Sequence, residues 1–251
     1  MKERKIALIT GASSGIGWST ALALAEKGFD LILCGRRSER LQQLSDAVKV
    51  ETHRLVFDVR DKQAVFEAIE GLPEQWKSIN VMINNAGNAH GLDTVQEASL
   101  DDWDAMIDSN VKGLMYVTKA VLPLLRKSSW GHIINVGSIA GKEAYPKGSV
   151  YCASKAAVQY FTDGLRLDLN PELIRVSAIH PGLVETEFSM IRFKGDAGRS
   201  KTVYQGADAL RAEDVADAIV YMVEAPKSVT IADLVILPTR QASAYVINRE
   251  S

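Results

Sequence analysis

The amino-acid sequence predicts an α/β fold of the doubly wound type, a single domain in which a parallel sheet of seven strands is covered by helices on both faces. Short apolar runs alternate with longer amphipathic segments along the chain, which is typical of a parallel sheet. Most of the short runs are apolar throughout, as in strands that are buried on both faces. A length of 251 residues suits one large domain that buries a sizeable core without disulfides or metals.

The short apolar runs predict the strands, and the segments with a helical period predict the helices. The expected strands are residues 6–10, 31–35, 54–58, 81–84, 132–137, 175–180 and 234–237. The expected helices are residues 17–28, 38–48, 61–71, 99–125, 149–169 and 212–223. Ser99, followed three residues later by Asp102, resembles a capping box that starts the fourth helix.

Residues 182–209 are the least regular stretch, polar and glycine-containing, and they follow the sixth expected strand. Ligands of an open α/β sheet bind outside the carboxyl ends of its strands. We therefore expect this segment to be a substrate lid, with a plain surface excursion as the alternative. No repeat, linker or low-complexity tract divides the chain, so residues 1–251 are expected to form one domain.

The charge balance and the cysteine content argue against several classes of protein. The chain has 29 basic and 31 acidic residues, a net charge of −2, so neither nucleic acid nor a membrane surface is an expected partner. Cys34 and Cys152 have no metal-ligand spacing, and we expect neither a disulfide framework nor a metal site. Cys152 is interpreted as a packing residue, with a reactive thiol as the alternative. Because no signal peptide or membrane span is visible, we expect a cytoplasmic protein.

A glycine-rich turn joins the first expected strand to the first expected helix. Its sequence, Thr-Gly-Ala-Ser-Ser-Gly-Ile-Gly over residues 10–17, permits a tight turn and a close approach of the backbone to a pyrophosphate. The N–H groups at the start of the helix are suited to bind phosphate. We predict a dinucleotide site here, with a turn that binds no ligand as the alternative. The expected contacts are Gly11, Ser13, Ser14, Gly15, Ile16 and Gly17.

The end of the second expected strand indicates which dinucleotide is bound. An enzyme for NAD usually carries Asp or Glu at this point to hold the ribose 2′-hydroxyl. This chain has Arg36 and Arg37 instead, two guanidinium groups that suit a 2′-phosphate. We therefore predict NADP(H), with Arg36 as the first candidate ligand and Arg37 as the second; solvated loop arginines are the alternative.

Tyr151 and Lys155 are four residues apart on an expected helix. Four residues advance about 400° and about 6 Å, so both side chains share one face. Tyrosine alone is a weak acid with a pKa of about 10, but a neighbouring ammonium group favours its phenolate and brings it into a working range. The pair is interpreted as an acid–base site, although a surface pair has the same spacing.

An ordered series of motifs resembles the short-chain dehydrogenase/reductase family over essentially the whole chain, which implies a Rossmann-type fold. The series comprises the glycine turn, Asp58 and Val59, the run Asn84 to Gly87, Asn110, Gly137 and Ser138, Tyr151 and Lys155, Pro181 and Gly182, and Thr186. In this family the residues after the third strand contact adenine, and those after the sixth contact the nicotinamide carboxamide. Cofactor contacts implied by the resemblance are Asp58, Val59, Asn85, Ala86, Gly87, Tyr151, Lys155, Pro181, Gly182, Val184 and Thr186.

The resemblance also implies the catalytic roles. Ser138 orients and polarises the substrate oxygen. Tyr151 is the general acid in reduction and the general base in oxidation, while Lys155 lowers the pKa of that tyrosine and binds the nicotinamide ribose. Asn110 helps to hold a water molecule that continues the proton path. Taken singly, Ser138 and Asn110 are also typical of caps and turns.

Several segments are similar to one subgroup, the NADP-dependent 3-hydroxy acid dehydrogenases, most clearly residues 181–189. This implies a small 3-hydroxy acid substrate such as serine or allo-threonine, or the matching 3-oxo acid, and Arg192, Lys194 and Lys142 are candidate cations for its carboxylate. A broad carbonyl or ketoacyl reductase is the alternative. A non-catalytic nucleotide-binding regulatory protein is disfavoured because Tyr151 and Lys155 are both present. The resemblance further implies a homotetramer or homodimer through the helices at residues 99–125 and 149–169.

Overall fold

The computed structural model describes residues 4–250 and contains one parallel sheet in the order β3-β2-β1-β4-β5-β6-β7. The strands are β1 (Ile6–Thr10), β2 (Asp30–Gly35), β3 (Thr52–Val56), β4 (Val81–Asn84), β5 (His132–Val136), β6 (Arg175–Pro181) and β7 (Asp233–Ile236). This confirms the predicted fold class. The strand order reverses between β1 and β4, where an open α/β sheet forms a crevice at the carboxyl ends of its strands.

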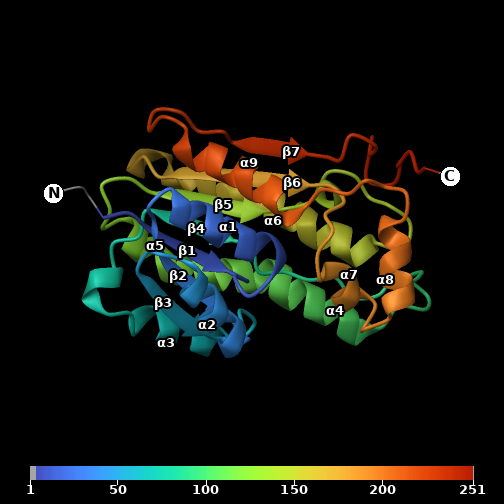
Figure 1. Ribbon diagram of the computed structural model, residues 1–251, viewed down its shortest axis with the longest axis horizontal. Coiled ribbons are helices and arrows are strands. Elements are labelled where there is room, and N and C mark those ends of the chain that lie inside the picture. Colours follow the sequence, from blue (N-terminus) through green and yellow to red (C-terminus); the bar gives the residue numbers. More distant parts are fainter. Residues whose placement is uncertain (1–3, 251) are drawn as a thin grey trace.

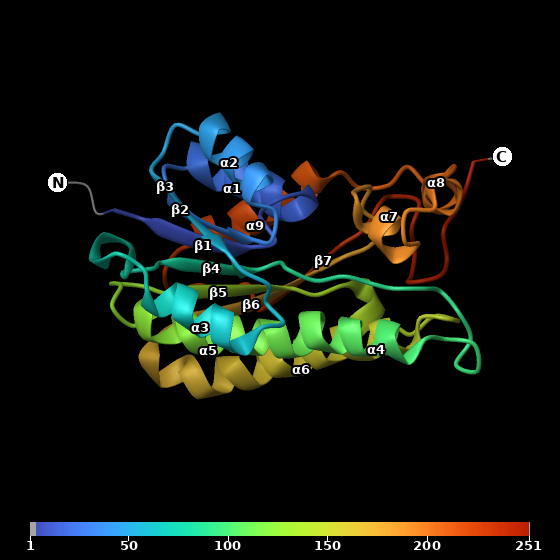
Figure 2. The same cartoon turned by 90° about the horizontal axis from the view of Figure 1, so that it is seen from below.

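Helices cover both faces of the sheet (Figure 1), and Figure 2 shows the two helical layers edge-on. One layer contains α1 (Gly15–Glu26), α2 (Ser38–Ala47) and α9 (Ala212–Glu224). The other contains α3 (Lys62–Glu70), α4 (Leu100–Ile107), α5 (Leu114–Leu125) and α6 (Ser149–Leu169). Short 3₁₀ turns are η1 (Glu74–Trp76), η3 (Ile139–Gly141) and η4 (Asn170–Glu172). Within residues 4–250, none of the helices combines the length and apolar character needed to cross a membrane.

The residues of β1 alternate between two apolar cores, one on each side of the sheet. Ile6 and Leu8 belong to the core shared with α3 and α5. Ala7 and Ile9 belong to the core shared with α1 and α9. All four are buried, which explains why this strand is apolar throughout rather than alternating.

The third strand lies earlier in the chain than the apolar pattern predicts. β3 is Thr52–Val56 instead of residues 54–58. It is an edge strand, paired with β2 alone within residues 4–250. Its first three residues are partly or fully exposed, so their polarity conceals its start. The chain turns after Phe57 because the carboxylate of Asp58 accepts a hydrogen bond from the N–H of Arg60 at 3.0 Å.

The helix expected over residues 99–125 is interrupted. A π-helical segment, η2 (Asp108–Gly113), separates α4 from α5 and contains Asn110. Ser99 caps α4 by accepting a hydrogen bond from the N–H of Asp102 at 3.4 Å, as the sequence predicts. The π segment leaves little trace in the sequence because one extra residue in a turn barely changes the apolar pattern, although such segments are frequent at functional sites.

Residues 182–209 contain two short helices, α7 (Phe188–Arg192) and α8 (Ala197–Tyr204), where the sequence indicates irregular chain. The two ends of the segment lie together, because Val184 forms a parallel bridge with Leu210. Figure 1 shows both helices beyond the carboxyl ends of the strands, near α4. These helices are hard to recognise in the sequence because the segment is polar. One of its polar residues, Asp196, caps α8 by accepting a hydrogen bond from the N–H of Arg199 at 3.0 Å.

Candidate active site

The turn between β1 and α1 has a backbone conformation that requires glycine. Gly11 and Gly15 have φ values of +67° and +52°, in the left-handed region. A Cβ atom on Gly17 would lie 2.4 Å from the carbonyl oxygen of Gly11. Ser14, the N-cap of α1, makes no side-chain capping hydrogen bond, so the first N–H groups of the helix remain available to an anion. These features fit the pyrophosphate of a dinucleotide.

The segment that follows β4 is tied to this turn. The hydroxyl of Thr10 accepts hydrogen bonds from the N–H groups of Asn85 and Ala86, each at 3.0 Å. The amide of Asn85 donates in return to the carbonyl of Thr10 at 3.0 Å. Gly87 lies against Asn110, whose Oδ1 would be 2.9 Å from a Cβ at that glycine. The structure thus brings these predicted residues together and adds Thr10, whose side chain the sequence does not single out.

Arg36 and Arg37 have different surroundings. The side chain of Arg36 is 62% exposed, and its guanidinium lies 3.6 Å from the carboxylate of Asp58. Arg37 donates Nε to the hydroxyl of Ser13 at 3.2 Å and pairs with the carboxylate of Glu187, at the start of α7, at 2.8 Å. Arg36 is therefore the freer of the two to bind a 2′-phosphate.

Tyr151 and Lys155 lie one turn apart in α6, and both are buried, with 8% and 6% of the residue exposed. The ammonium of Lys155 donates a hydrogen bond to the carbonyl of Val136, at the end of β5, at 3.0 Å. Burial lowers the pKa of Lys155 to about 8, because the charged amine loses its hydration. At neutral pH the amine is therefore still mostly charged, but it loses its proton at a pH only slightly higher.

The phenol of Tyr151 is held in its protonated form. Burial raises its pKa, as does the neighbouring Tyr145, whereas a hydrogen bond with the Ser138 side chain and the guanidinium of Arg192 lower it. The Arg192 guanidinium lies 5.7 Å from the centre of the Tyr151 ring. Arg192 is thus a second cation beside this phenol, in addition to Lys155, to which the family resemblance assigns the lowering of its pKa. A protonated phenol is the form that a general acid needs.

Ser138 and Asn110 reach the site from β5 and from η2. The hydroxyl of Ser138 starts η3 by accepting a hydrogen bond from the N–H of Ala140 at 3.1 Å. Asn110 is 1% exposed, and its amide donates to the carbonyl of Asn88 at 2.8 Å and to the hydroxyl of Ser154 at 3.0 Å. The Asn110 side chain therefore links the loop after β4 to α6. Ser154 is a part of this link that the sequence does not indicate.

The start of the expected lid approaches the glycine turn. Thr186 lies 3.2 Å from the position that a Cβ on Gly15 would occupy. Gly182 packs on Gln241, whose Oε1 accepts a hydrogen bond from the N–H of Leu183 at 2.7 Å. Thr186 is thus placed beside the turn, whereas Gly182 packs on Gln241, Val184 bridges Leu210, and the predicted contact Val59 packs on Gly113 of η2. The contribution of Gln241 depends on a residue far along the chain and is not apparent from the sequence.

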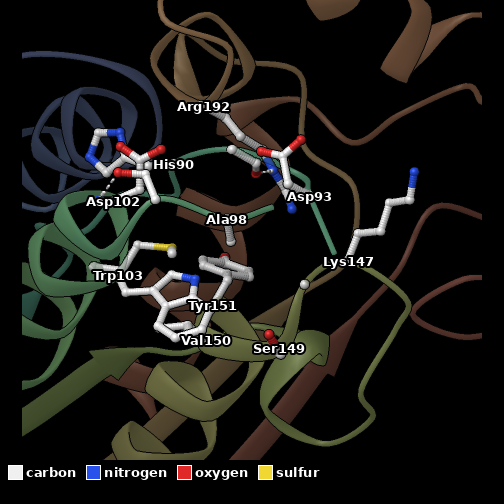
Figure 3. Close-up of a pocket in the computed structure, with 14 residues that line it drawn as sticks. His90, Asp93, Ala98, Asp102, Trp103, Lys147, Ser149, Val150, Tyr151 and Arg192 are labelled. Carbon is white, nitrogen blue, oxygen red and sulfur yellow. Dashed lines mark hydrogen bonds between the residues drawn. The ribbon is translucent and has the colours of Figure 1, made fainter. Parts of the chain in front are cut away.

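A shallow pocket, open to solvent, lies between Tyr151 and the expected lid (Figure 3). Trp103 of α4, Tyr151 of α6 and Arg192 of α7 line it. Arg192 is held by a hydrogen bond from Nε to the carbonyl of Gly91 at 2.9 Å and lies over the rings of Tyr145 and Tyr151. A guanidinium beside the tyrosine is suited to bind an anionic group of a substrate.

The other two candidate cations are paired with acidic residues. Lys142 forms an ion pair with Asp233 of β7 at 2.5 Å and is not among the residues that line this pocket. Lys194 pairs with Asp102 at 3.0 Å, and its side chain is 64% exposed. Of the three candidates, only Arg192 lies against Tyr151.

The chain is similar to known proteins along most of its length. The model of the short chain dehydrogenase family matches residues 5–196. Sulfoacetaldehyde reductase 2 of Chromohalobacter salexigens is 45% identical over 249 residues, 98% of this chain and 99% of that protein. An NADP-dependent 3-hydroxy acid dehydrogenase of Escherichia coli K12 is 43% identical over 240 residues, 95% of this chain and 97% of that protein. The closed form of a serine dehydrogenase complexed with NADP+ has a TM-score of 0.92 at 42% identity and covers 98% of this chain and 100% of its own.

Proposed function

Because the chain belongs to the short chain dehydrogenase family, we propose that it is an NADP(H)-dependent oxidoreductase that acts on small 3-hydroxy acids, such as serine or allo-threonine, or on the matching 3-oxo acids. One observation carries this proposal: a glycine turn suited to a dinucleotide meets Tyr151, Ser138 and Lys155 at the carboxyl ends of the strands. The relatives that are named for NADP and for hydroxy acids support it.

The residues on this edge of the sheet fit NADP(H), which supplies or accepts the hydride when it is bound. The N–H groups of α1 would hold the pyrophosphate and Arg36 the 2′-phosphate. Lys155 would bind the nicotinamide ribose, and Val184 and Thr186 would contact the carboxamide. Arg37 would hold the turn and the start of the lid together through Ser13 and Glu187.

The side chains of the site move the proton. In reduction, the phenol of Tyr151 donates its proton to the substrate oxygen, and the hydroxyl of Ser138 donates a hydrogen bond to that oxygen and polarises it. The ammonium of Lys155 stabilises the phenolate that remains. Asn110 holds the loop after β4 against α6, where a water molecule continues the proton path. Oxidation uses the same groups in reverse, with Tyr151 as the base.

Arg192 supports an anionic substrate. It lies against Tyr151 at the pocket, and its position is fixed by the carbonyl of Gly91. A 3-hydroxy acid bound with its hydroxyl at Tyr151 would direct its carboxylate towards this guanidinium. A sulfonate is a second anion of similar size, and the 45% identity to a sulfoacetaldehyde reductase favours a sulfonated aldehyde as the second candidate substrate.

A substrate screen tests the proposed function directly. NADP+ reduction is followed with 3-hydroxy acids, and NADPH oxidation with 3-oxo acids, sulfoacetaldehyde, diketones and simple aldehydes. We expect the highest kcat/KM with an anionic substrate. A preference for uncharged ketones would point instead to a broad carbonyl or ketoacyl reductase, and no turnover of any compound would contradict the proposal.

We expect Arg36→Ala to lower kcat/KM for NADPH by about 10- to 100-fold and to leave kcat/KM for NADH nearly unchanged. Hydrogen bonds to a charged group contribute about 1.5 to 3 kcal/mol, and each 1.4 kcal/mol is about tenfold in affinity. Arg126→Ala at the end of α5, an exposed arginine paired with Glu172, is the control. Equal losses with both cofactors, or a wild-type preference for NADH, would contradict the assignment of Arg36.

We expect Arg192→Leu to lower kcat/KM for the best acidic substrate by about 10- to 100-fold, because a charge-assisted contact is lost. The loss for an uncharged ketone should be much smaller. Lys194→Ala, which removes an exposed lysine from the same segment, is the matched control. If acidic and uncharged substrates lose activity equally, Arg192 acts only through the phenol of Tyr151 and does not bind the carboxylate.

Other properties stay predictions. We propose that residues 182–209 act as a lid, since α7 brings Phe188 and Arg192 to Tyr151. A homotetramer or homodimer is supported by α6, which exposes Tyr160 and Leu167 by 80% and 79%. A location in the cytoplasm is expected from the sequence alone.

A further inference from the structure

His180 is a buried titratable residue that the proposed reaction does not use. It is the penultimate residue of β6, and none of its surface is exposed to solvent. Its ring lies against the backbone that leads to Ser138: a Cβ on Gly137 would be 2.6 Å from Nδ1. The same nitrogen lies 3.2 Å from the main-chain carbonyl oxygen of Ser138, within hydrogen-bond geometry.

The opposite side of the ring faces an ion pair. Nε2 of His180 lies 2.9 Å from the carboxylate of Asp233, in the neighbouring strand β7. The other oxygen of that carboxylate pairs with Lys142 at 2.5 Å. Lys142 directly follows η3, the short helix that Ser138 caps. The contacts therefore run from the backbone of Ser138 through His180 and Asp233 to Lys142, and so return to the segment that carries Ser138.

The two contacts of the imidazole compete for one proton. A neutral ring carries a single N–H, whereas the carbonyl of Ser138 and the carboxylate of Asp233 are both acceptors. Nε2 has no hydrogen bond, although it is close to Asp233, while Nδ1 is placed to donate to Ser138. Lys142 already supplies a cation to Asp233. The geometry therefore favours the proton on Nδ1.

We propose that His180 is a positioning residue for Ser138: its Nδ1–H holds the Ser138 carbonyl, while Asp233 and Lys142 lie on the other side of its ring. This inference rests on the proposed function, because it requires Ser138 to act on the substrate oxygen. The hydroxyl of Ser138 has to reach both Tyr151 and the substrate, and a small shift of its backbone misplaces both contacts.

Two amide variants separate the two sides of the ring. In His180→Asn, the amide nitrogen takes the place of Nδ1 and keeps the donor to Ser138. In His180→Gln, it takes the place of Nε2 and keeps only the contact with Asp233. We expect kcat of the Asn variant to stay within about threefold of wild type and kcat of the Gln variant to fall about tenfold, the effect of one lost hydrogen bond in the reacting geometry.

Two further readouts distinguish positioning from general damage. The KM for NADPH should be unchanged in both variants, since His180 does not touch the glycine turn. The solvent deuterium isotope effect on kcat should increase in His180→Gln, because slower proton transfer becomes rate-limiting. Equal losses in the Asn and Gln variants, or an unchanged kcat in the Gln variant, would overturn the proposal.

A variant outside the buried ring keeps the test decisive if a His180 variant does not fold. The side chain of Asp233 is 39% exposed, and Asp233→Ala removes the carboxylate beside Nε2 while Nδ1–H remains the donor to Ser138. We expect kcat to stay within about threefold of wild type at constant KM for NADPH, and a fall of tenfold or more would show that the side of the ring facing Asp233, rather than the donor to Ser138, matters and would overturn the proposal. Ser138→Ala is the reference: if wild type turns over and Ser138→Ala does not, the proposed function holds whatever His180 does.

Discussion

Replacing Tyr151 with phenylalanine should lower kcat by about 10²- to 10⁴-fold, the usual contribution of a general acid or base, while NADPH binding stays within about twofold. Tyr151 is 8% exposed, and its phenol keeps its proton because burial raises its pKa. Phenylalanine retains the ring and its packing on Phe188, whose centre is 5.8 Å away, and removes only the oxygen that carries the proton. The loss should therefore appear in the chemical step.

The measurement is a steady-state assay with the best substrate from the screen, together with a fluorescence titration of NADPH. Tyr160→Phe is the matched control, because this tyrosine lies on the same helix and is 80% exposed. Activity of Tyr151→Phe within tenfold of wild type would mean that another group supplies the proton, and it would remove the main support for the assigned mechanism.

Replacing Lys155 with methionine should stabilise the protein without cofactor and inactivate it. Burial lowers the pKa of this amine from its usual 10.5 to about 8. Each pKa unit corresponds to about 1.4 kcal/mol, so keeping the amine charged at pH 7 costs the folded state about 3 kcal/mol. Methionine removes that cost but also the hydrogen bond to Val136, which contributes about 1 kcal/mol. We expect the free energy of unfolding to rise by about 2 kcal/mol and kcat to fall by about 10²-fold.

The pH dependence of this effect has a definite sign. The unfolded chain keeps the lysine proton up to about pH 10.5, whereas the folded chain releases it near pH 8. Wild type therefore gains stability relative to the methionine variant as pH rises from about 8 to 10.5, and the advantage of the variant should shrink over that range. Urea unfolding at pH 7 and pH 10 measures it, with Lys119→Met, an exposed position on α5, as the control. A variant that is less stable than wild type at pH 7 would show that the ammonium stabilises the fold.

The two variants together describe how the site is built. Lys155 is buried where its charge is unfavourable for stability. In the proposed mechanism this charge serves as a cation beside the nicotinamide ribose and the tyrosine phenolate. Tyr151 is buried, which suits it as an acid, and Arg192 opposes the rise in its pKa. A site that is less stable than the same fold without its charges is a common feature of enzymes.

Elements that depend on local pattern could be predicted from the sequence. β1 and β4 have the predicted bounds because they are buried on both faces and end at a turn motif. β3 is displaced because an edge strand has only one buried face, and polar residues such as Arg54 occupy its exposed side. The π segment at Asn110 interrupts a helix without interrupting its apolar stripe, so the sequence predicts one continuous helix there.

By itself, the sequence determined the doubly wound fold, the glycine turn and the order of Ser138, Tyr151 and Lys155 along the chain. The fold and the glycine turn follow from periodicity and from spacings within one element, which neighbouring residues impose on the backbone. The order of Ser138, Tyr151 and Lys155 is informative through the family resemblance. Only the tertiary structure decided that Arg37 pairs with Glu187, 150 residues away, and that Arg36 is left free. It alone places the ring of His180 against the backbone of Ser138, although the two residues are 42 positions apart in the chain. It also decided that Arg192, and neither Lys142 nor Lys194, lies against Tyr151. Such contacts arise when separate strands and the segment after β6 converge at one edge of the sheet, and no local pattern specifies which side chains then meet.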